Sequence, residues 1–287
     1  MYRKVESQDF NLFHKSSDYE WANHCYKVLS QFIPLNVPKY KKVIDKRVKV
    51  GYTESYYVQS KTCDYVTLLE SIWYKNRKRV IPFEFVKDYL DVKALAWWYQ
   101  DDGHLKLEKN IPRKIILSTD SFTKEENEFL IKELNRKYLL SFSRDSQNRL
   151  VIYDQRQIYY FIRLTQPYMH KSMVRKSFPI PHKNTPNQAY RTTIYLPETI
   201  KLTKPTYQIN KQLENLSDIL DIVKVRESYL NFYKNKLLVL NEITIRKSYQ
   251  VIIDKSHREK MVECKNYTGL NNSDIVTICF IMNSNTL

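Results

Sequence analysis

The sequence contains little glycine and no paired cysteines, and each absence excludes a class of function. Glycine occurs at only three of 287 positions: Gly51, Gly103 and Gly269. Phosphate-binding loops of nucleotide-dependent enzymes need several glycines within one short turn, so neither a P-loop nor a dinucleotide-binding fold is expected. The four cysteines are scattered and form no CxxC pair, which argues against a structural zinc site and a disulfide framework.

Long apolar runs are also missing. No stretch approaches the roughly 18 to 20 residues that a membrane span needs. The residues that follow Met1 (Tyr-Arg-Lys-Val-Glu) contain no apolar segment of the signal-peptide type. We therefore expect a cytoplasmic protein with reduced cysteines and no membrane partner.

The charge is strongly positive. Lysine and arginine number 47 against 31 aspartates and glutamates, a formal net charge of +16. Such an excess indicates a polyanionic partner. Nucleic acid is favoured over a membrane surface, because the basic residues are spread along the chain rather than gathered on one amphipathic helix. Most of the excess lies in residues 1–184, with the remainder in 185–287.

Hydrophobic patterning predicts alternating strands and helices, an α+β chain. A hairpin of residues 46–50 and 55–60 is expected around Gly51, preceded by a helix over 18–32 and followed by a helix that begins at Asp64. After Gly103 the pattern of two strands and a helix is expected twice, over the following ranges: 105–108, 114–118, 123–137, 140–144, 150–153 and 155–164. The first 180 residues are therefore expected to contain two related halves.

The most informative segment is Leu95-Ala-Trp-Trp-Tyr-Gln-Asp-Asp-Gly103. It predicts an apolar helix that ends in two carboxylates, Asp101 and Asp102. Acidic groups are unfavourable at a helix C-terminus, where the helix dipole is negative, unless a cation is nearby. Adjacent helical residues point about 100° apart, so the two carboxylates are not expected to serve one site equally.

This segment resembles the second motif of the LAGLIDADG homing endonucleases. Three further segments agree with the family in order and spacing: Arg79-Val-Ile-Pro82, Leu117-Ser-Thr-Asp-Ser-Phe122 and Met173-Val-Arg-Lys-Ser-Phe178. The resemblance implies two αββαββα halves whose motif helices pack together, each with a curved antiparallel sheet that lies along the DNA major groove. Residues 1–90 would be the remainder of a first half, and 91–181 the second half with its motif at 95–103.

The same resemblance implies site residues. Asp102 is expected to bind Mg²⁺, with the carbonyl of Asp101 as a helper, and Mg²⁺ suits phosphodiester hydrolysis. Basic residues near the cleavage sites are expected at Lys176 and at Arg79 or neighbouring Lys78. Contacts to double-stranded DNA are expected from residues on the sheets and their turns: Lys46, Arg47, Lys49, Tyr52, Tyr56, Lys106, Lys114, Arg144 and Arg149.

One feature departs from the family pattern. A single-chain member should carry two motifs, and residues 1–90 contain no first one. The segment from Asn11 resembles the part that normally follows the first motif, so we expect its helix to lie before Met1. A separate N-terminal fragment is therefore an expected partner.

The C-terminal part of the sequence, residues 182–287, includes a segment that resembles a different kind of module. Residues 182–245 are expected to form a linker and a helical region. Residues 246–287 are similar to a ribbon-helix-helix DNA-binding module, in which two copies of the chain dimerise and insert paired strands into the major groove. Lys247, Tyr249 or Gln250 would then face DNA, depending on register. An ordinary strand packed on two helices is the equal alternative.

Taken as a whole, the sequence predicts a site-specific, Mg²⁺-dependent double-stranded DNA endonuclease of the homing type. The alternatives are an intron maturase that binds intron RNA and a DNA-binding remnant without catalytic activity. A bacterial or phage protein associated with the nucleoid is expected, with an organelle as the alternative.

Overall fold

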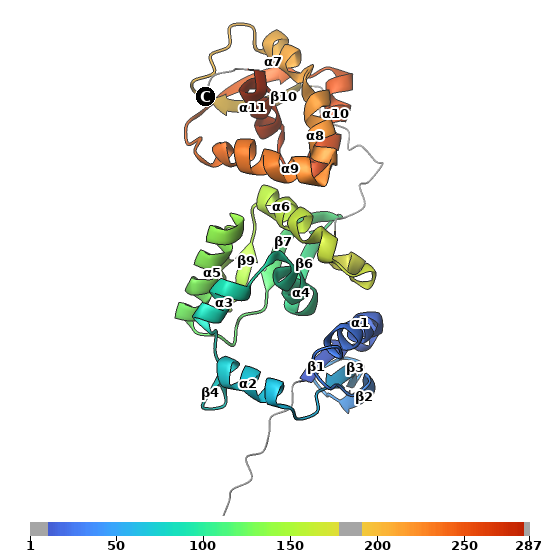
Figure 1. Ribbon diagram of the computed structural model, residues 1–287. Helices are drawn as coiled ribbons and strands as arrows, with labels where there is room; N and C mark the ends of the chain where they lie inside the picture. The colour runs from blue at the N-terminus through green and yellow to red at the C-terminus, as the bar shows by residue number, and fades with distance from the viewer. Residues whose placement is uncertain (1–10, 178–190, 284–287) are drawn as a thin grey trace, which may run out of the picture.

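The computed structural model describes residues 11–177 and 191–283. Three units follow one another from bottom to top in Figure 1: an N-terminal unit, a central unit and a C-terminal unit. Residues 182–190, at the start of the expected linker and helical region, and the two ends of the chain lie outside the described residues. Within residues 11–177 and 191–283, no helix is both long and apolar enough to cross a membrane.

The central unit contains the complete αββαββα order expected of one half. Its elements are α4 (Val92–Asp102), β6 (Gly103–Glu108), β7 (Ile111–Leu117), α5 (Lys124–Tyr138), β8 (Ser143–Arg144), β9 (Leu150–Ile152) and α6 (Gln155–Thr165). The four strands form an antiparallel sheet in the order β6-β7-β9-β8. A short-range signal explains the start of α5, where Thr123 and Glu126 form a capping box.

One face of this sheet is the core of the unit. Register places Leu105 opposite Ile115, and Ile115 opposite Ile152. All three side chains are buried, as are their neighbours two residues along the strands, Leu117 and Leu150. Because side chains alternate along a strand, the residues between them belong to the opposite face. The helices therefore cover this face of the sheet. The opposite face is mixed, because His104 and Lys106 are exposed on it whereas Ile116 and Val151 are buried.

The N-terminal unit repeats most of this order. Its elements are β1 (Asn11–Lys15), α1 (Tyr19–Leu29), β2 (Lys39–Ile44), β3 (Tyr52–Gln59) and α2 (Asp64–Trp73). They match β7, α5, β8, β9 and α6 in sequence order, and the sheet order β1-β3-β2 matches β7-β9-β8. Between residues 11 and 90, no described element corresponds to α4 or β6. A short hairpin, β4 (Tyr74–Lys75) and β5 (Lys78–Arg79), and α3 (Phe83–Tyr89) connect this unit to the next.

The structure corrects the first hairpin. The strand expected at 46–50 is wrong: β2 ends at Ile44, and residues 45–51 form the turn to β3. Asp45 Oδ1 accepts hydrogen bonds from the backbone N–H and the Nε of Arg47, which satisfies the backbone locally and ends the strand. Gly51 has φ +76°, a conformation that favours glycine. The alternation seen at 46–50 therefore lies in a turn.

The C-terminal unit spans residues 191–283 and includes both tail regions. Its elements are β10 (Arg191–Pro197), α7 (Pro205–Leu213), α8 (Leu216–Lys224), α9 (Arg226–Phe232), β11 (Arg246–Ile252), α10 (Lys255–Thr268) and α11 (Asn272–Asn283). Strand β11 pairs with β10 of the same chain along its whole length. The expected boundary at 245 therefore falls between two strands that form one ribbon.

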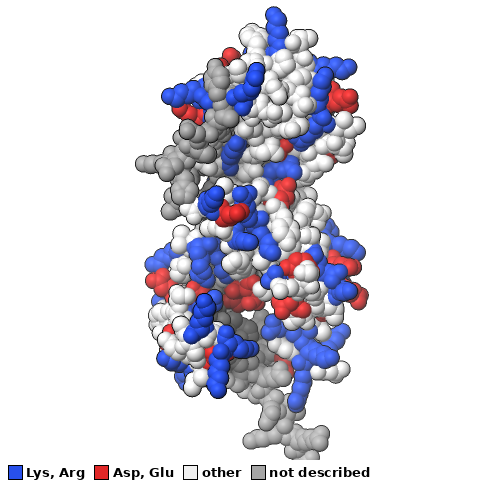
Figure 2. Space-filling view, turned by 180° about the vertical axis from the view of Figure 1, so that it is seen from behind, with Lys and Arg blue, Asp and Glu red and all other residues white. Residues whose placement is uncertain are grey.

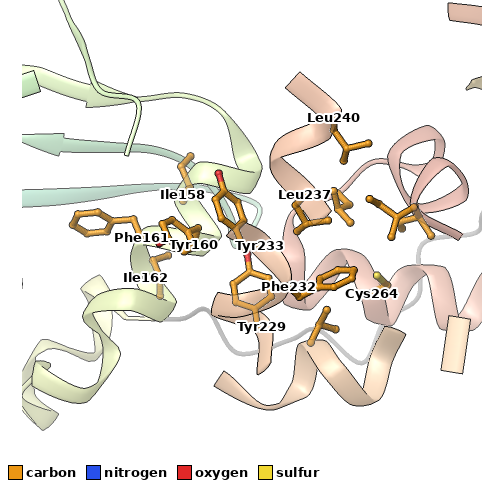
Figure 3. Close-up of a cluster of buried hydrophobic side chains, with 14 of the residues drawn as sticks. Ile158, Tyr160, Phe161, Ile162, Tyr229, Phe232, Tyr233, Leu237, Leu240 and Cys264 are labelled. Atoms are coloured by element: carbon orange, nitrogen blue, oxygen red, sulfur yellow. The ribbon is translucent and has the colours of Figure 1, made fainter. Parts of the chain in front are cut away.

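The C-terminal unit packs directly on α6, as Figure 3 shows. The rings of Tyr160 and Tyr233 stack at 4.0 Å between centroids. Gln157 Nε2 donates to Tyr233 Oη at 2.6 Å, and Arg226 Nε donates to the carbonyl of Arg163 at 2.8 Å. Residues 157–165 of α6 are all buried, since one side of the helix faces the central sheet and the other faces the C-terminal unit. The central and C-terminal units consequently share one hydrophobic core.

This shared core predicts a large effect of Tyr233→Ala. Removing a fully buried ring leaves a cavity and should lower the free energy of unfolding by about 3 to 5 kcal/mol. Tyr207→Ala on α7 is the matched control, because Tyr207 is 64% exposed, and it should change stability by less than about 0.5 kcal/mol. Denaturant unfolding measures both. Equal effects of the two substitutions would show that α6 and the C-terminal unit are not packed together.

Candidate functional site

The site is built around the end of helix α4. The helix begins at a local cap, in which Asp91 Oδ1 accepts from the N–H of Ala94 at 2.7 Å. Leu95, Ala96 and Tyr99 are fully buried and anchor the helix to the central unit. The helix ends at Asp102, as the sequence predicts.

Gly103 makes a very tight turn after α4 possible. Its φ of −91° is ordinary, so backbone freedom is not the reason for glycine here. A Cβ at this position would collide with the ring and the carbonyl of Tyr99. The carbonyl of Asp102 then accepts from the N–H of Ser118 on the neighbouring strand at 3.1 Å. The close approach therefore holds the backbone of Asp102 against the central sheet.

Lys176 supplies the cation that the end of α4 requires. Its Nζ donates to the carbonyl of Gln100 at 2.6 Å and to that of Tyr99 at 3.3 Å. In return, the Tyr99 hydroxyl donates to the carbonyl of Lys176 at 2.9 Å. A cation at the negative end of a helix is favourable. Lys176 is also buried, and this burial lowers the pKa of its ammonium group to about 8.

The residues before Lys176 hold this end of the helix to the N-terminal unit. Arg175 Nη2 pairs with Asp18 Oδ2 at 2.8 Å. Gln100, which is buried, accepts from the N–H of His170 at 2.5 Å and donates to the carbonyl of Tyr168 at 3.0 Å. The segment 168–176 therefore contacts both units at the place where α4 ends.

The two carboxylates differ in their contacts, as expected from their angular separation. Both residues are exposed. Trp21 Nε1 of α1 donates to Asp101 Oδ1 at 3.3 Å, so Asp101 faces the N-terminal unit. In the described parts of the chain, no group of three His, Cys, Asp or Glu side chains is placed to bind a metal ion. Mg²⁺ is commonly bound by one or two carboxylates together with substrate phosphates, and the exposed carboxylate of Asp102 fits that mode.

The other basic candidates lie elsewhere. Lys78 and Arg79 form strand β5 and are exposed. Figure 1 shows this hairpin at the lower left, beside α2. The structure therefore places Lys176, rather than Lys78 or Arg79, at the end of α4.

The face of the central sheet that points away from the helices carries a cluster of cations. His104 and Lys106 on β6 are exposed there, and Lys106 pairs with Lys114 on β7. The pKa of the His104 imidazole is lowered by partial desolvation and then by the charges around it, namely Lys176, Lys15, Lys114 and Arg149. His104 and Lys15 were not among the sequence candidates. The only signal for His104 was its place directly after Gly103.

Register decides which residues of the first sheet share this face. Tyr56 packs on Tyr19 of α1, with ring centroids 4.6 Å apart, and it shares its face of β3 with buried Val58. Tyr52 belongs to the same face by alternation. Tyr52 and Tyr56 therefore lie on the face of β3 that carries Val58, and their expected contact with DNA stays a prediction.

Residues one position away occupy the open face of the first sheet. Ser55 lies there, with Lys15 opposite it on β1 and Lys41 opposite it on β2. Tyr57 follows on the same face, opposite Lys39. Lys15 also contributes to the field at His104, which indicates that its ammonium group lies near His104.

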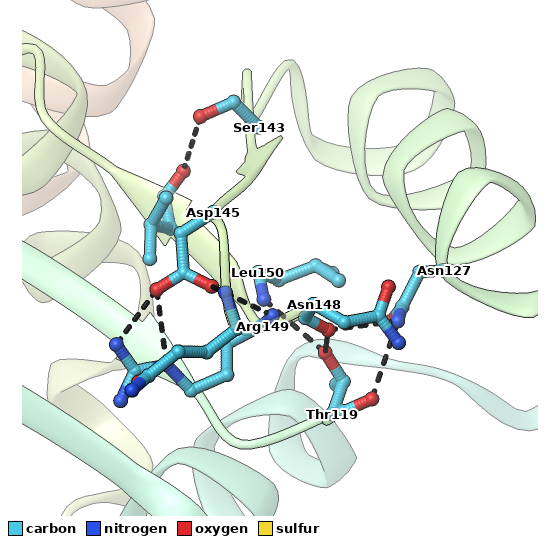
Figure 4. Close-up of polar contacts among 9 residues, drawn as sticks. Thr119, Asn127, Ser143, Asp145, Asn148, Arg149 and Leu150 are labelled. Atoms are coloured by element: carbon cyan, nitrogen blue, oxygen red, sulfur yellow. Dashed lines mark hydrogen bonds and ion pairs between the residues drawn. The ribbon is translucent and has the colours of Figure 1, made fainter. Parts of the chain in front are cut away.

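The two remaining candidates of the central sheet, Arg144 and Arg149, flank the turn between β8 and β9, and Figure 4 shows the contacts of this turn. Arg149 forms two hydrogen bonds with Asp145, from Nε at 3.0 Å and from Nη2 at 2.7 Å. Thr119 Oγ1 and Asn127 Nδ2 both donate to the carbonyl of Asn148. The segment 117–122, which the sequence comparison singled out, therefore fixes this turn. Arg144 is exposed and donates to Asn148 Oδ1 at 3.3 Å.

The tail candidates also divide between two faces. Tyr249 is buried, and its hydroxyl donates to the carbonyl of Ile200 at 3.0 Å, so it does not face outward. Gln250 is exposed on the opposite face of β11. Lys247 is exposed at the start of the strand, with its Nζ 5.6 Å from the centroid of the Tyr249 ring. Figure 2 shows that Lys and Arg are spread over the whole of one side of the molecule, with Asp and Glu interspersed among them.

Curated relatives of the chain include named endonucleases. This chain is 35% identical over 108 residues to the "Probable intron-encoded endonuclease 1" of Wickerhamomyces canadensis. The matched segment covers 36% of this chain and 46% of the relative. It is 34% identical over 112 residues to the "Intron-encoded endonuclease ai4" of Dictyostelium discoideum, covering 37% and 65%. An uncharacterized protein of Methanocaldococcus jannaschii is 28% identical over 168 residues, covering 58% and 64%. The chain thus spans about half to two thirds of these relatives.

A solved structure and a family model agree with the fold. The structure described as "The homing endonuclease I-WcaI bound to its DNA recognition sequence" matches with a TM-score of 0.52 and 22% identity, over 61% of this chain and 77% of the other. The expected α+β fold is confirmed by this likeness and by the order of elements in the central unit. The model described as the LAGLIDADG DNA endonuclease family matches residues 2–171, more than half of the sequence, and the chain therefore belongs to that family.

Proposed function

We propose that this protein is a homing-type endonuclease that binds a long double-stranded DNA site and hydrolyses phosphodiester bonds with Mg²⁺. The observation that carries the proposal is the end of α4. There an exposed carboxylate, Asp102, lies beside a buried lysine and next to the open, cation-bearing face of two sheets. Membership of the family and the named relatives support it.

The residues at the end of α4 have separate proposed roles. Asp102 would hold Mg²⁺ with its carboxylate, and Asp101 would assist. The bound ion would polarise a phosphate and lower the pKa of a water molecule. Gly103 and the contact with Ser118 keep Asp102 at a fixed position relative to the sheet that carries the DNA.

Lys176 is proposed to position the end of α4 rather than to remove a proton. Its Nζ is directed at two backbone carbonyls, which fixes the residues just before the carboxylates. Its charge also contributes to the electropositive field around His104. Loss of Lys176 should therefore disturb both the geometry of the site and its attraction for phosphate.

Binding of DNA without cleavage is the second candidate. The observation that favours it is that residues 11–177 present one such helix end, whereas cutting two strands calls for two metal-binding carboxylates. A second helix supplied by a further segment or a separate chain would restore the pair, and nicking of one strand is the activity expected from the described site alone.

Substitution of Asp102 separates these candidates. In Asp102→Asn the rate of DNA nicking should fall by at least about a thousandfold, because several kcal/mol of transition-state stabilisation depend on the metal. Binding should remain, since Asn keeps the size of the side chain. Asp88→Asn on α3, also exposed, is the matched control and should cleave normally. The assay uses Mg²⁺ and a pool of intron-free host loci.

Tight binding by the wild type with no nicking under any condition would instead establish the binding-only alternative. Nicking by Asp102→Asn at the wild-type rate would remove Asp102 from the mechanism.

Lys41 and Lys42 provide a test of the DNA face, because adjacent residues on a strand point to opposite faces. Lys41→Ala should weaken binding to duplex DNA and reduce the slope of log affinity against log salt by about one, as expected for one lost phosphate contact. Lys42, whose Nζ lies 3.6 Å from the centroid of the Tyr52 ring, serves as the control. Lys42→Ala should leave the slope unchanged. The reverse result would show that the faces are assigned wrongly.

The buried ammonium of Lys176 predicts a dependence of stability on pH. Because its pKa in the folded protein is about 8 and the ordinary value is 10.5, the unfolded chain binds the proton more tightly. The free energy of unfolding contributed by this group should therefore rise between pH 8 and 10.5, by roughly 3 kcal/mol.

Lys176→Met removes this titration. The difference in unfolding free energy between wild type and variant should then change across that pH window and be constant below it. A constant difference throughout would mean that Lys176 is not buried against α4.

A further inference from the structure

The two strands of the C-terminal unit form a ribbon with one covered and one open face. They pair in register from Arg191 opposite Ile252 to Pro197 opposite Arg246. The covered face carries buried Ile194, Leu196, Tyr249 and Val251. The residues that alternate with them are exposed: Arg191, Thr193, Tyr195, Ser248 and Gln250.

The ribbon is complete within one chain and is held rigidly from behind. Helix α11 begins beside β10, where Ser273 Oγ accepts from the N–H of Tyr195 at 2.9 Å. Helix α7 holds β11, because Asn210 Nδ2 donates to the carbonyl of Ile252 at 2.8 Å. The order of one strand and two helices occurs twice, as β10-α7-α8 and β11-α10-α11. A second copy of the chain is therefore not needed to form the paired strands.

The chemistry of the open face suits a polyanion with hydrogen-bonding edges. Thr193 lies opposite Gln250, and Tyr195 lies opposite Ser248. These side chains both donate and accept hydrogen bonds. On this face Arg191 is exposed, whereas Arg246 pairs with Asp274 and Lys247 belongs to the covered face; neither strand contains an acidic residue. The major groove of B-form DNA admits a two-stranded antiparallel ribbon and presents donors and acceptors on every base pair.

We propose that this open face is a second DNA-binding surface, which enters the major groove of the duplex outside the segment bound by the two larger sheets. It depends on neither Asp102 nor metal, so it extends the proposed function. The paired strands that were expected from two copies of the chain are formed here within a single chain.

The packing on α6 fixes the position of this surface relative to the central unit. Because the C-terminal and central units share one core, the ribbon is held at a fixed distance from the end of α4. Once the central unit is on DNA, contact by the ribbon becomes intramolecular, and even a weak contact raises the overall affinity.

Two substitutions on the open face test the proposal. Thr193→Glu combined with Gln250→Glu adds two like charges facing the phosphates and should weaken binding of the full chain to a long random-sequence duplex by at least about tenfold. Ser228→Glu, at an exposed position on α9, is the control and should bind within about twofold of wild type. Denaturant unfolding confirms that both variants fold.

Cross-linking distinguishes direct contact from an indirect effect. A photoreactive side chain placed at Tyr195 should cross-link to duplex DNA, whereas the same group at Ser228 should not. It should not cross-link to duplex RNA, because the major groove of A-form helices is too narrow for a ribbon. Equal cross-linking at both positions, stronger cross-linking to RNA, or wild-type affinity of the double variant would overturn the proposal.

A further variant separates this proposal from the previous one. Lys41→Glu should weaken DNA binding through the larger sheets and leave the cross-link at Tyr195 in place at high protein concentration. If Lys41→Glu has no effect while the ribbon variants lose binding, the ribbon is the main DNA contact. The proposed role of the larger sheets is then overturned, and the proposal for the ribbon stands.

Discussion

The arrangement of the site depends on one interaction, the pair of hydrogen bonds from Lys176 to the last carbonyls of α4. A helix that ends in two carboxylates concentrates negative charge where its dipole is already negative. The ammonium group offsets that charge, and the Tyr99 hydroxyl returns a hydrogen bond to the lysine backbone. Through Arg175 and Asp18 the same segment also ties the N-terminal unit to this helix end. The segment that contains Arg175 and Lys176 thus fixes the position of the carboxylates and also holds the N-terminal and central units together.

Features encoded by neighbouring residues could be predicted from the sequence. The end of α4 at Asp102 and the position of α5 both follow from short-range patterns, and the structure confirms them. The reason for Gly103 is different, because it lies in a collision with Tyr99 rather than in backbone conformation. Sequence alone shows that a glycine is present but not which neighbour requires it.

Features set by contacts between distant segments could not be predicted in the same way. A shift of one residue exchanges the two faces of a strand, so Tyr57, and not Tyr56, lies on the open face of β3. The pairing of β10 with β11 spans about fifty residues and turns an expected dimer contact into an internal one. Charge clusters such as that around His104 arise only when several strands and the segment of Lys176 come together.

The burial of α6 on both sides has a consequence for synthesis of the protein on the ribosome. Tyr160 and its neighbours are translated well before Tyr233, which covers them. At roughly 5 to 20 residues per second, the apolar outer side of α6 stays uncovered for several seconds while the intervening chain emerges. The nascent protein therefore passes through an interval in which its central unit is folded but still exposes the apolar side chains of α6. Chaperone binding during that interval would compete directly with docking of the C-terminal unit.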